Sequence, residues 1–302
     1  SCCNICKQSK IPMVLKMHQE LSIIKTMNMK ANNVMNILWG QIQRSGKSYI
    51  MAGCIHENGP GNYLIITTAP KETIDQYNNV FNNYLQFNDF TVINLNGSNK
   101  KPKIGNINII ICSKQFLQSK VGNSNNERAK SIKWLKDIQF DMRFVDEAHN
   151  GGTTELAKNV LAFYGNTAFT VHITATYSKP QNAFGIAPQN WILWDLEDIC
   201  MCKNIKIKKR ELILKHGNDL ANIIDNYSDD AIEQEYAKYP NLHILTHEIV
   251  PDHKQKIIDA TRTNHYGWSP KACFLLKHDA TGKTPLAEFQ NDAEALKIWY
   301  NI

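Results

Sequence analysis

Between residue 34 and about residue 176, short apolar runs alternate with longer amphipathic stretches. Several of the apolar runs lack period-2 alternation, which indicates strands buried on both faces of a parallel sheet. Strand–helix alternation of this kind predicts an α/β fold, a doubly wound domain with a mostly parallel sheet. The expected strands are Val34–Trp39, Tyr63–Thr67, Phe90–Leu95, Ile107–Cys112, Phe140–Val145 and Ala168–Thr174, and the expected helices are Lys47–Glu57, Lys71–Leu85, Asn126–Ile138 and Thr154–Tyr164.

The first expected strand leads into a tight turn that ends in Gly-Lys-Ser. The run is Gln43, Arg44, Ser45, Gly46, Lys47, Ser48, and a helix-like stretch follows it. In a phosphate-binding loop, backbone N–H groups and a helix N-terminus receive phosphate, the Lys reaches the same oxygens, and the hydroxyl binds Mg²⁺. One departure is present, because the first glycine of the usual pattern would stand at position 41, which is Gln41.

A second candidate site element follows the expected strand Phe140–Val145. Asp146 and Glu147 stand at its carboxyl end, the edge where α/β sheets bind ligands. Adjacent carboxylates in an extended chain point in different directions. That arrangement suits a divided role, with Asp146 holding Mg²⁺ and Glu147 polarising an attacking water.

Four stretches then carry a family resemblance, which covers about residues 13 to 200. The run Asp-Glu-Ala-His at 146–149 resembles the box of that composition in superfamily 2 helicases and translocases. Ile-Thr-Ala-Thr at 173–176 resembles their third motif, and Thr-Thr-Ala-Pro at 67–70 resembles the motif that grips the tracking strand. Leu-Lys-Met-His-Gln at 15–19 resembles the element that precedes their phosphate loop. Members with a similar loop include restriction-enzyme motor subunits and helicases of large DNA viruses.

The resemblance implies a RecA-like P-loop NTPase fold that uses ATP and Mg²⁺ to move along nucleic acid, with DNA favoured over RNA. It implies that Gln19 reads adenine, that Arg44, Ser45, Gly46, Lys47 and Ser48 hold the phosphates, and that Ser48 and Asp146 bind Mg²⁺. It further implies catalysis by Lys47, Asp146 and Glu147. His149, Thr174 and Thr176 would couple the γ-phosphate to the nucleic acid, and Thr68, Pro70 and Lys71 would contact the nucleic acid. Without the resemblance, Thr174 and Thr176 read equally well as ordinary strand threonines.

The domain organisation expected from the sequence has three parts. Residues 1–33 form an N-terminal segment with the Gln19 element, residues 34–200 form the ATP-binding domain, and residues 201–302 form an α+β accessory region or the start of a second RecA-like domain. Six Lys or Arg fall within residues 203–215, and the basic stretch Lys203–Arg210 either touches phosphates or is a solvated connector. Later elements are expected to be a helical, acidic stretch at Asn218–Tyr239, strands at Leu242–Leu245 and Ala272–Leu276, and a closing helix at Leu286–Tyr300.

Composition places few limits on the function. The net charge of +6 permits nucleic-acid binding without requiring it, and no apolar run approaches the roughly 20 residues of a membrane span. Eight scattered cysteines favour free thiols in a reducing, intracellular setting. The resemblance implies that this setting is a bacterium or the host cell of a virus. The pair Cys3 and Cys6 has zinc-ligand spacing, but a tetrahedral zinc needs four ligands. Because the chain begins without Met and without a signal peptide, we expect it to be a fragment of a longer protein.

A second RecA-like domain, in the same chain or another, normally supplies arginine fingers to such a site. Beyond Arg210 this chain has one arginine, Arg262, without the expected Gln and Gly spacing. An arginine finger contributes about 10³–10⁵ in turnover, so hydrolysis by this chain alone is expected to be weak. Two other interpretations stay open at this point: a nucleic-acid-binding module with a vestigial nucleotide pocket, and a nucleotide switch unrelated to nucleic acid.

Overall fold

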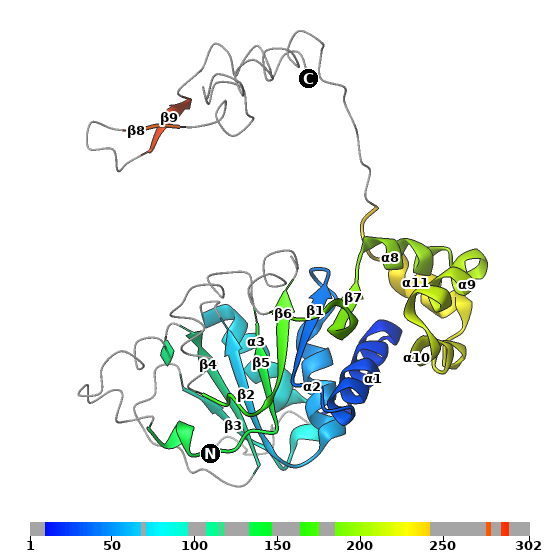
Figure 1. Ribbon diagram of the computed structural model, residues 1–302. Coiled ribbons are helices and arrows are strands. Elements are labelled where there is room, and N and C mark those ends of the chain that lie inside the picture. The colour runs from blue at the N-terminus through cyan, green and yellow to red at the C-terminus, as the bar shows by residue number, and fades with distance from the viewer. Residues whose placement is uncertain are drawn as a thin grey trace, which may run out of the picture. The chain divides into compact units, whose positions relative to one another are not determined.

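The computed structural model describes residues 10–67, 71–95, 107–114, 116–117, 133–146, 164–174, 185–241, 276–278 and 285–289. The chain divides into two compact units, Ser1–Pro240 and Asn241–Ile302. The first unit contains the sheet, and its elements are coloured blue to yellow in Figure 1. The sequence led us to expect a boundary near residue 200. In the structure, residues 201–240 belong to the same compact unit as the sheet.

Seven parallel strands form one sheet within the described residues of the first unit, in the order β3-β4-β2-β5-β6-β1-β7. The α/β fold with a RecA-like parallel sheet is thereby confirmed. The six expected strands are all present, each within two residues of its expected start. The seventh, β7, was not expected from the sequence. The strands are β1 (Asn36–Gln41), β2 (Asn62–Thr67), β3 (Thr91–Asn94), β4 (Asn108–Ser113), β5 (Met142–Val145), β6 (Phe169–Thr174) and β7 (Trp191–Trp194).

Side chains alternate between the two faces of the sheet, and each face has its own apolar cluster. On one face, Trp39, Ile65 and Phe144 pack against helices α1 (Met17–Ala31), α2 (Lys47–Asn58) and α3 (Lys71–Asn83). On the other face, residues such as Leu64 and Ile110 pack with Leu117 and Leu135. Burial of both faces explains why the strands read as nearly continuous apolar runs.

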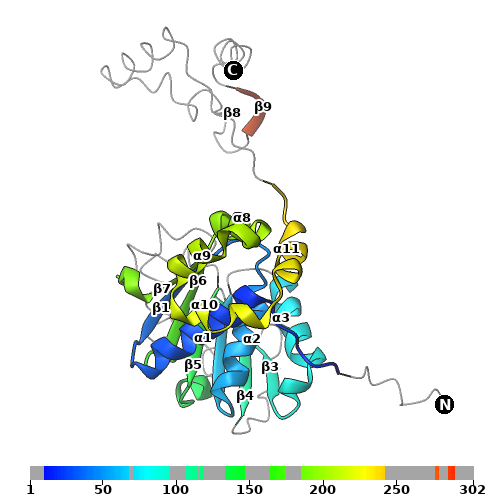
Figure 2. The same cartoon turned by 90° about the vertical axis from the view of Figure 1, so that its right-hand side faces the viewer.

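A group of short helices follows β7 and packs against α1. We call Leu196–Ala237 the helical segment; both views show it beside α1 and β7 (Figures 1 and 2). A third apolar cluster connects the helical segment to the sheet and α1. It includes Met17 and Leu21 of α1 and Trp194 of β7. Its elements are α8 (Leu196–Lys203), α9 (Ile205–His216), α10 (Asn218–Ala221), a 3-10 turn (Ile224–Asn226) and α11 (Asp229–Ala237).

Most of the basic stretch lies in helix α9, and several of its charges are paired within the helical segment. Lys206 contacts Asp230 and Glu233, and Lys209 contacts Asp225 and Asp229. Within the described residues, these contacts place the basic stretch in a folded helix rather than in a solvated connector. They also reduce the positive charge that it offers to phosphates.

The second unit contains an antiparallel strand pair, β8 (Leu276–His278) and β9 (Pro285–Phe289). The expected closing helix is therefore wrong over residues 286–289. Pairing with the neighbouring strand outweighs the helix propensity of Leu, Ala and Glu in this stretch. The rest of that expected helix, and the expected strand Leu242–Leu245, lie outside the described residues.

Candidate functional site

The loop between β1 and α2, residues 42–46, forms a tight turn ahead of a 12-residue helix. Two of its residues have left-handed backbones, Arg44 with φ 64° and Gly46 with φ 79°. Two observations explain the glycine at position 46. Its left-handed backbone is strained for other residues, and a Cβ at this position would lie 2.3 Å from Nε2 of Gln19. The loop therefore delivers the chain directly into the N-terminus of α2, where unpaired N–H groups favour an anion.

Gln41 takes the place of the usual first glycine, and the structure gives it a specific role. Its side chain is fully buried, and its Nε2 donates to Oγ of Ser22 at 2.8 Å. On the loop side, Oγ of Ser45 donates to its Oε1 at 3.5 Å. Gln41 thus links α1 to the β1–α2 loop through its side chain, so the departure from the glycine pattern does not remove the loop.

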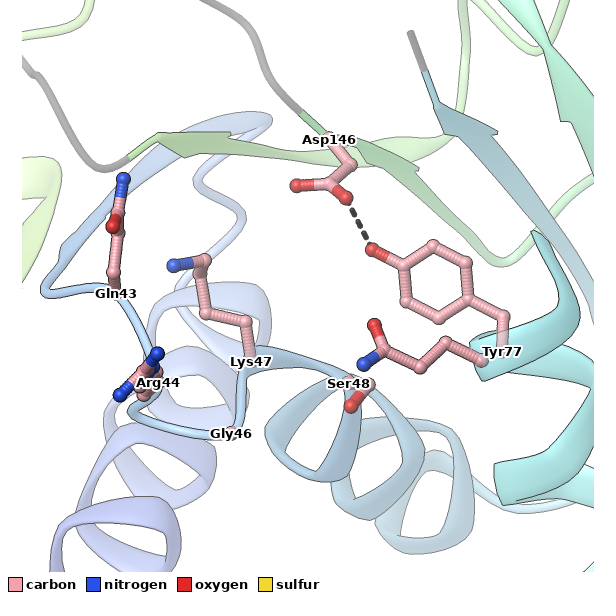
Figure 3. A pocket seen from close by; sticks show the side chains of 8 residues that line it. Gln43, Arg44, Gly46, Lys47, Ser48, Tyr77 and Asp146 are labelled. Carbon is pink, nitrogen blue, oxygen red and sulfur yellow. Dashed lines mark hydrogen bonds between the residues drawn. The ribbon is translucent and has the colours of Figure 1, made fainter. Parts of the chain in front are cut away.

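A cavity of about 320 Å³ opens beside the loop. Figure 3 shows that it is bordered by the loop, the start of α2, one side of α3 and the end of β5. Six polar or charged side chains line it together with Tyr77 and the glycine backbone. The lining residues are Gln43, Arg44, Gly46, Lys47, Ser48, Gln76, Tyr77 and Asp146.

Lys47 and Asp146 come from different elements and border the same cavity (Figure 3). The Nζ of Lys47 donates to the carbonyls of Gln41 and Ile42, each at 3.4 Å. These long contacts fold the ammonium back over its own loop. A lysine held in this way can turn toward an anion that enters the cavity, since Nζ has three donors.

Asp146 follows β5 directly, and its backbone N–H donates to the carbonyl of Ile66 at 2.8 Å. The residue is 6% exposed, and the hydroxyl of Tyr77 donates to its carboxylate. Tyr77 was missed by the sequence reasoning. It lies on the apolar face of α3 with Val80 and Phe81, so its pattern is that of a core residue and nothing in the sequence marks it as a site residue.

The side chain of Gln19 contacts the β1–α2 loop. Its Nε2 donates to the carbonyl of Ser45 at 3.1 Å, and its Oε1 accepts from the N–H of Lys16 at 2.9 Å. A carboxamide keeps one further donor and one further lone pair after these two bonds. The reading of adenine by Gln19 stays a prediction, and the contact with the loop is a second role that the sequence did not suggest.

Thr174 ends β6 and lies opposite Gly40 of β1 in the parallel register. It is buried, 1% exposed, at the same edge of the sheet as the β1–α2 loop. Lys71 is the first residue of α3. The other expected coupling, catalytic and nucleic-acid residues lie outside the described residues, as do the two cysteines of the expected zinc pair; they are Glu147, His149, Thr176, Thr68, Pro70, Cys3 and Cys6.

The side chains around the cavity are of the kinds that bind a nucleotide together with Mg²⁺. Hydroxyl and carboxylate oxygens, such as those of Ser48 and Asp146, are the ligands that Mg²⁺ prefers, together with phosphate oxygens. Nowhere in the described part of the chain, this cavity included, is a group of three or more His, Cys, Asp or Glu placed to hold a metal ion. Over the same residues, no helix is long and apolar enough to cross a membrane.

A parallel RecA-like sheet, a loop entering a helix N-terminus, and a lysine and an aspartate that line one cavity define a P-loop nucleotide-binding protein. Comparison with known families then identifies the group. Residues 12–179 match the family described as "Type III restriction enzyme, res subunit", and this chain belongs to that family. Its first unit is a superfamily 2 motor domain, and membership implies the use of ATP.

Solved structures of motor proteins also resemble the chain. One is described as "ATP-dependent Type ISP restriction-modification enzyme LlaBIII bound to DNA", at 17% identity and a TM-score of 0.39, over 55% of this chain and 13% of that one. Another is described as "Sulfolobus solfataricus SWI2/SNF2 ATPase core in complex with dsDNA", at 16% identity and a TM-score of 0.41, over 72% of this chain and 59% of that one. The chain thus spans a minor part of the first protein and under two thirds of the second. Among curated proteins, none matches it significantly.

Proposed function

We propose that this chain is the ATP-binding first motor domain of an ATP-dependent DNA translocase or helicase. The observation that carries the proposal is the cavity shared by Lys47, Ser48 and Asp146. It combines an anion-binding loop with a carboxylate at the carboxyl edge of a parallel sheet, as phosphoryl transfer requires. Membership of the restriction-enzyme family supports DNA as the partner.

The proposed roles divide between binding and hydrolysis. The backbone of Arg44, Ser45 and Gly46 cradles the β- and γ-phosphates, and Lys47 neutralises their charge. Ser48 and Asp146 would hold Mg²⁺, which neutralises charge that develops on the phosphate oxygens. Glu147 comes directly after Asp146 in the chain and is proposed to polarise the attacking water.

Coupling to the nucleic acid is proposed for the same edge of the sheet. Thr174 lies in register with Gly40, just ahead of the loop, so a shift of the loop on hydrolysis would reach β6 through adjacent backbone. His149 and Thr176 are proposed to share that role. Thr68, Pro70 and Lys71 follow β2 or begin α3, and they are proposed to contact the nucleic acid.

The proposal includes a second RecA-like domain, in this protein or a partner, that completes the ATP site with arginine. Arg262 is the one arginine in the chain after Arg210. Without finger arginines, turnover is expected to fall by about 10³–10⁵, so binding is the property to test first. Nucleotide binding should therefore be measurable where hydrolysis is slow.

Substitution of Lys47 tests the function directly. Isothermal calorimetry with ATP and Mg²⁺ should give saturable heat for the parent chain and none for Lys47→Ala, because the phosphates lose their cation. Lys208→Ala removes the same charge from a surface pair with Glu211 and should bind like the parent. Glu147→Gln should keep the heat and lose the remaining hydrolysis, since only the polarising carboxylate is changed.

The same measurement separates this proposal from its alternatives. A vestigial pocket would give no saturable heat in the parent chain. A nucleotide switch unrelated to nucleic acid would bind ATP but show no salt-sensitive affinity for single- or double-stranded DNA or RNA. DNA binding whose logarithm falls linearly with the logarithm of salt concentration would support the motor proposal.

A further inference from the structure

The carbonyl group of Ser45, inside the β1–α2 loop, accepts two side-chain hydrogen bonds from α1. Nε2 of His18 lies 2.7 Å from this oxygen, and Nε2 of Gln19 lies 3.1 Å from it. Ser45 is 1% exposed, so water does not substitute for these donors. Two donors from consecutive residues of one helix therefore fix where this carbonyl points.

The direction of that carbonyl also sets the direction of the next N–H group. In a trans peptide the C=O and the following N–H point to opposite sides. All peptides of the described chain are trans, so the N–H of Gly46 points away from α1. Gly46 borders the cavity, and its N–H is one of the groups that a phosphate loop presents to the ligand.

His18 is itself held by the helical segment. Its ring is fully buried and stacks on Trp194 with 5.2 Å between centroids and an interplanar angle of 17°. Nδ1 lies 2.6 Å from the hydroxyl of Tyr236 in α11. The ring thus forms a bridge of two short hydrogen bonds between α11 and the β1–α2 loop.

The chemistry of the partners decides the direction of both bonds. A carbonyl oxygen only accepts, so Nε2 of His18 must carry the proton that faces Ser45. Burial lowers the pKa of His18 to about 4, which keeps the ring neutral near pH 7 and leaves Nδ1 as an acceptor. Burial also raises the pKa of Tyr236 well above its usual value, so its hydroxyl keeps the proton that it donates to Nδ1.

We propose that Tyr236 and His18 are positioning residues for nucleotide binding: Tyr236 holds the histidine ring with Nε2 against the carbonyl of Ser45, which aims the N–H of Gly46 into the phosphate site. The inference rests on the proposed function of the cavity and adds to it a dependence on the helical segment. Neither residue touches the ligand in this scheme. They act through the peptide between Ser45 and Gly46.

Removal of one oxygen atom tests the bridge. Tyr236→Phe takes away the donor to Nδ1, so the imidazole loses one of the two hydrogen bonds that hold it and is free to tilt away from the carbonyl of Ser45. Affinity for a fluorescent ADP analogue should fall about tenfold, the effect of weakening one buried hydrogen bond in the loop. A loss below twofold would overturn the proposal.

The chain offers a matched control and a rescue. Tyr227 of the helical segment also donates its hydroxyl to α1, to Glu20 at 2.6 Å, without reaching the loop. Tyr227→Phe should keep the parent affinity; an equal loss in both variants would make the effect general loosening and sink the proposal. His18→Gln keeps a donor near Ser45 and should retain most of the affinity that His18→Leu loses.

Nitrogen-15 NMR of histidine-labelled full chain gives a readout that needs no nucleotide. His18 should show the Nε2–H tautomer in both chains, with the Nδ1 resonance of a hydrogen-bonded acceptor in the parent chain and that of an acceptor without a hydrogen bond in Tyr236→Phe. An Nδ1 resonance that is unchanged in that variant would overturn the bridge. If the parent chain bound no nucleotide, the proposed function would fall while the NMR result still decided whether the bridge exists.

Discussion

At the scale of single residues, the tyrosine hydroxyl next to Asp146 is the contact with the most direct consequence for chemistry. Tyr77 donates to one oxygen of the Asp146 carboxylate, which restricts the rotation of that group at the cavity that both residues line. Groups that orient a metal ligand commonly contribute 10–100-fold in metal affinity. Under the proposed function, in which Asp146 binds Mg²⁺, Tyr77 would orient that carboxylate for the metal ion.

Tyr77→Phe should raise the Mg²⁺ concentration needed for half-maximal nucleotide binding about tenfold, because the carboxylate loses its orientation. A titration of Mg²⁺ at fixed ATP, followed by calorimetry, measures the change. Tyr84→Phe is the control, since its hydroxyl contacts Tyr49 at 3.3 Å outside the lining of the cavity. Equal midpoints for the parent and Tyr77→Phe would contradict the role.

Some contacts of the candidate site could be predicted from the sequence and others could not. The position of Lys47, Ser48 and Asp146 at one cavity was predictable, because a local pattern marks each residue and parallel strands bring their ends to one edge of the sheet. The partnership of His18 with Tyr236 was not, since 218 residues separate them and Tyr236 belongs to no local pattern. The role of Gln41 as a link between α1 and the loop was not predictable either. It depends on hydrogen bonds with Ser22 and Ser45, which only the folded chain brings next to Gln41.

At the scale of elements, α8 and α9 are joined by a buried carboxylate. Asp198 has no exposed surface; its Oδ1 lies 2.8 Å from Nε2 of His216 and 2.9 Å from Nζ of Lys215, and its Oδ2 accepts from the N–H of Asp195 at 2.8 Å. Burial alone would raise the pKa of Asp198. The hydrogen bond and charge of His216, with bonds from Asp195 and Lys215, lower it further than burial raises it.

Asp198→Asn should lower the free energy of unfolding at pH 7 by about 3 kcal/mol, the cost of breaking a buried ion pair. The folded-state pKa of Asp198 lies below its ordinary value, so its contribution is present above pH ~3.9 and is lost as the pH falls through the folded pKa. Urea unfolding at several pH values should show the difference shrinking in acid. Asp230→Asn, which breaks an exposed pair with Lys206, should change stability little.

The elements themselves were predictable in proportion to their burial. The six strands of the sheet read clearly as apolar runs because helices or loops cover both faces. Strand β7 was missed because Trp191–Trp194 is short and half of it is only partly buried. The strand Pro285–Phe289 was read as a helix because its residues favour helices in isolation and only their pairing makes them a strand.

At the scale of the whole molecule, every described residue that lines the cavity or forms the bridge lies before Pro240, within the first unit. A chain that ends at Pro240 should therefore bind the fluorescent ADP analogue with an affinity within about threefold of the full chain. Titration of both chains under one set of conditions measures this. A large loss of affinity would mean that residues after Pro240 contribute to the site.

The strand order of the sheet has a consequence for folding during synthesis on the ribosome. Strand β1, which leads into the β1–α2 loop, emerges early, yet its neighbours β6 and β7 are made far later in the chain. Both edges of β1 lack their final pairing until Thr174 has left the exit tunnel, and one edge lacks it until Trp194 has left. Such apolar edges invite aggregation. Contacts this distant in sequence also close slowly. Nascent chains stalled before residue 190 should consequently depend on chaperones, although the nucleotide-binding motif has long since been synthesised.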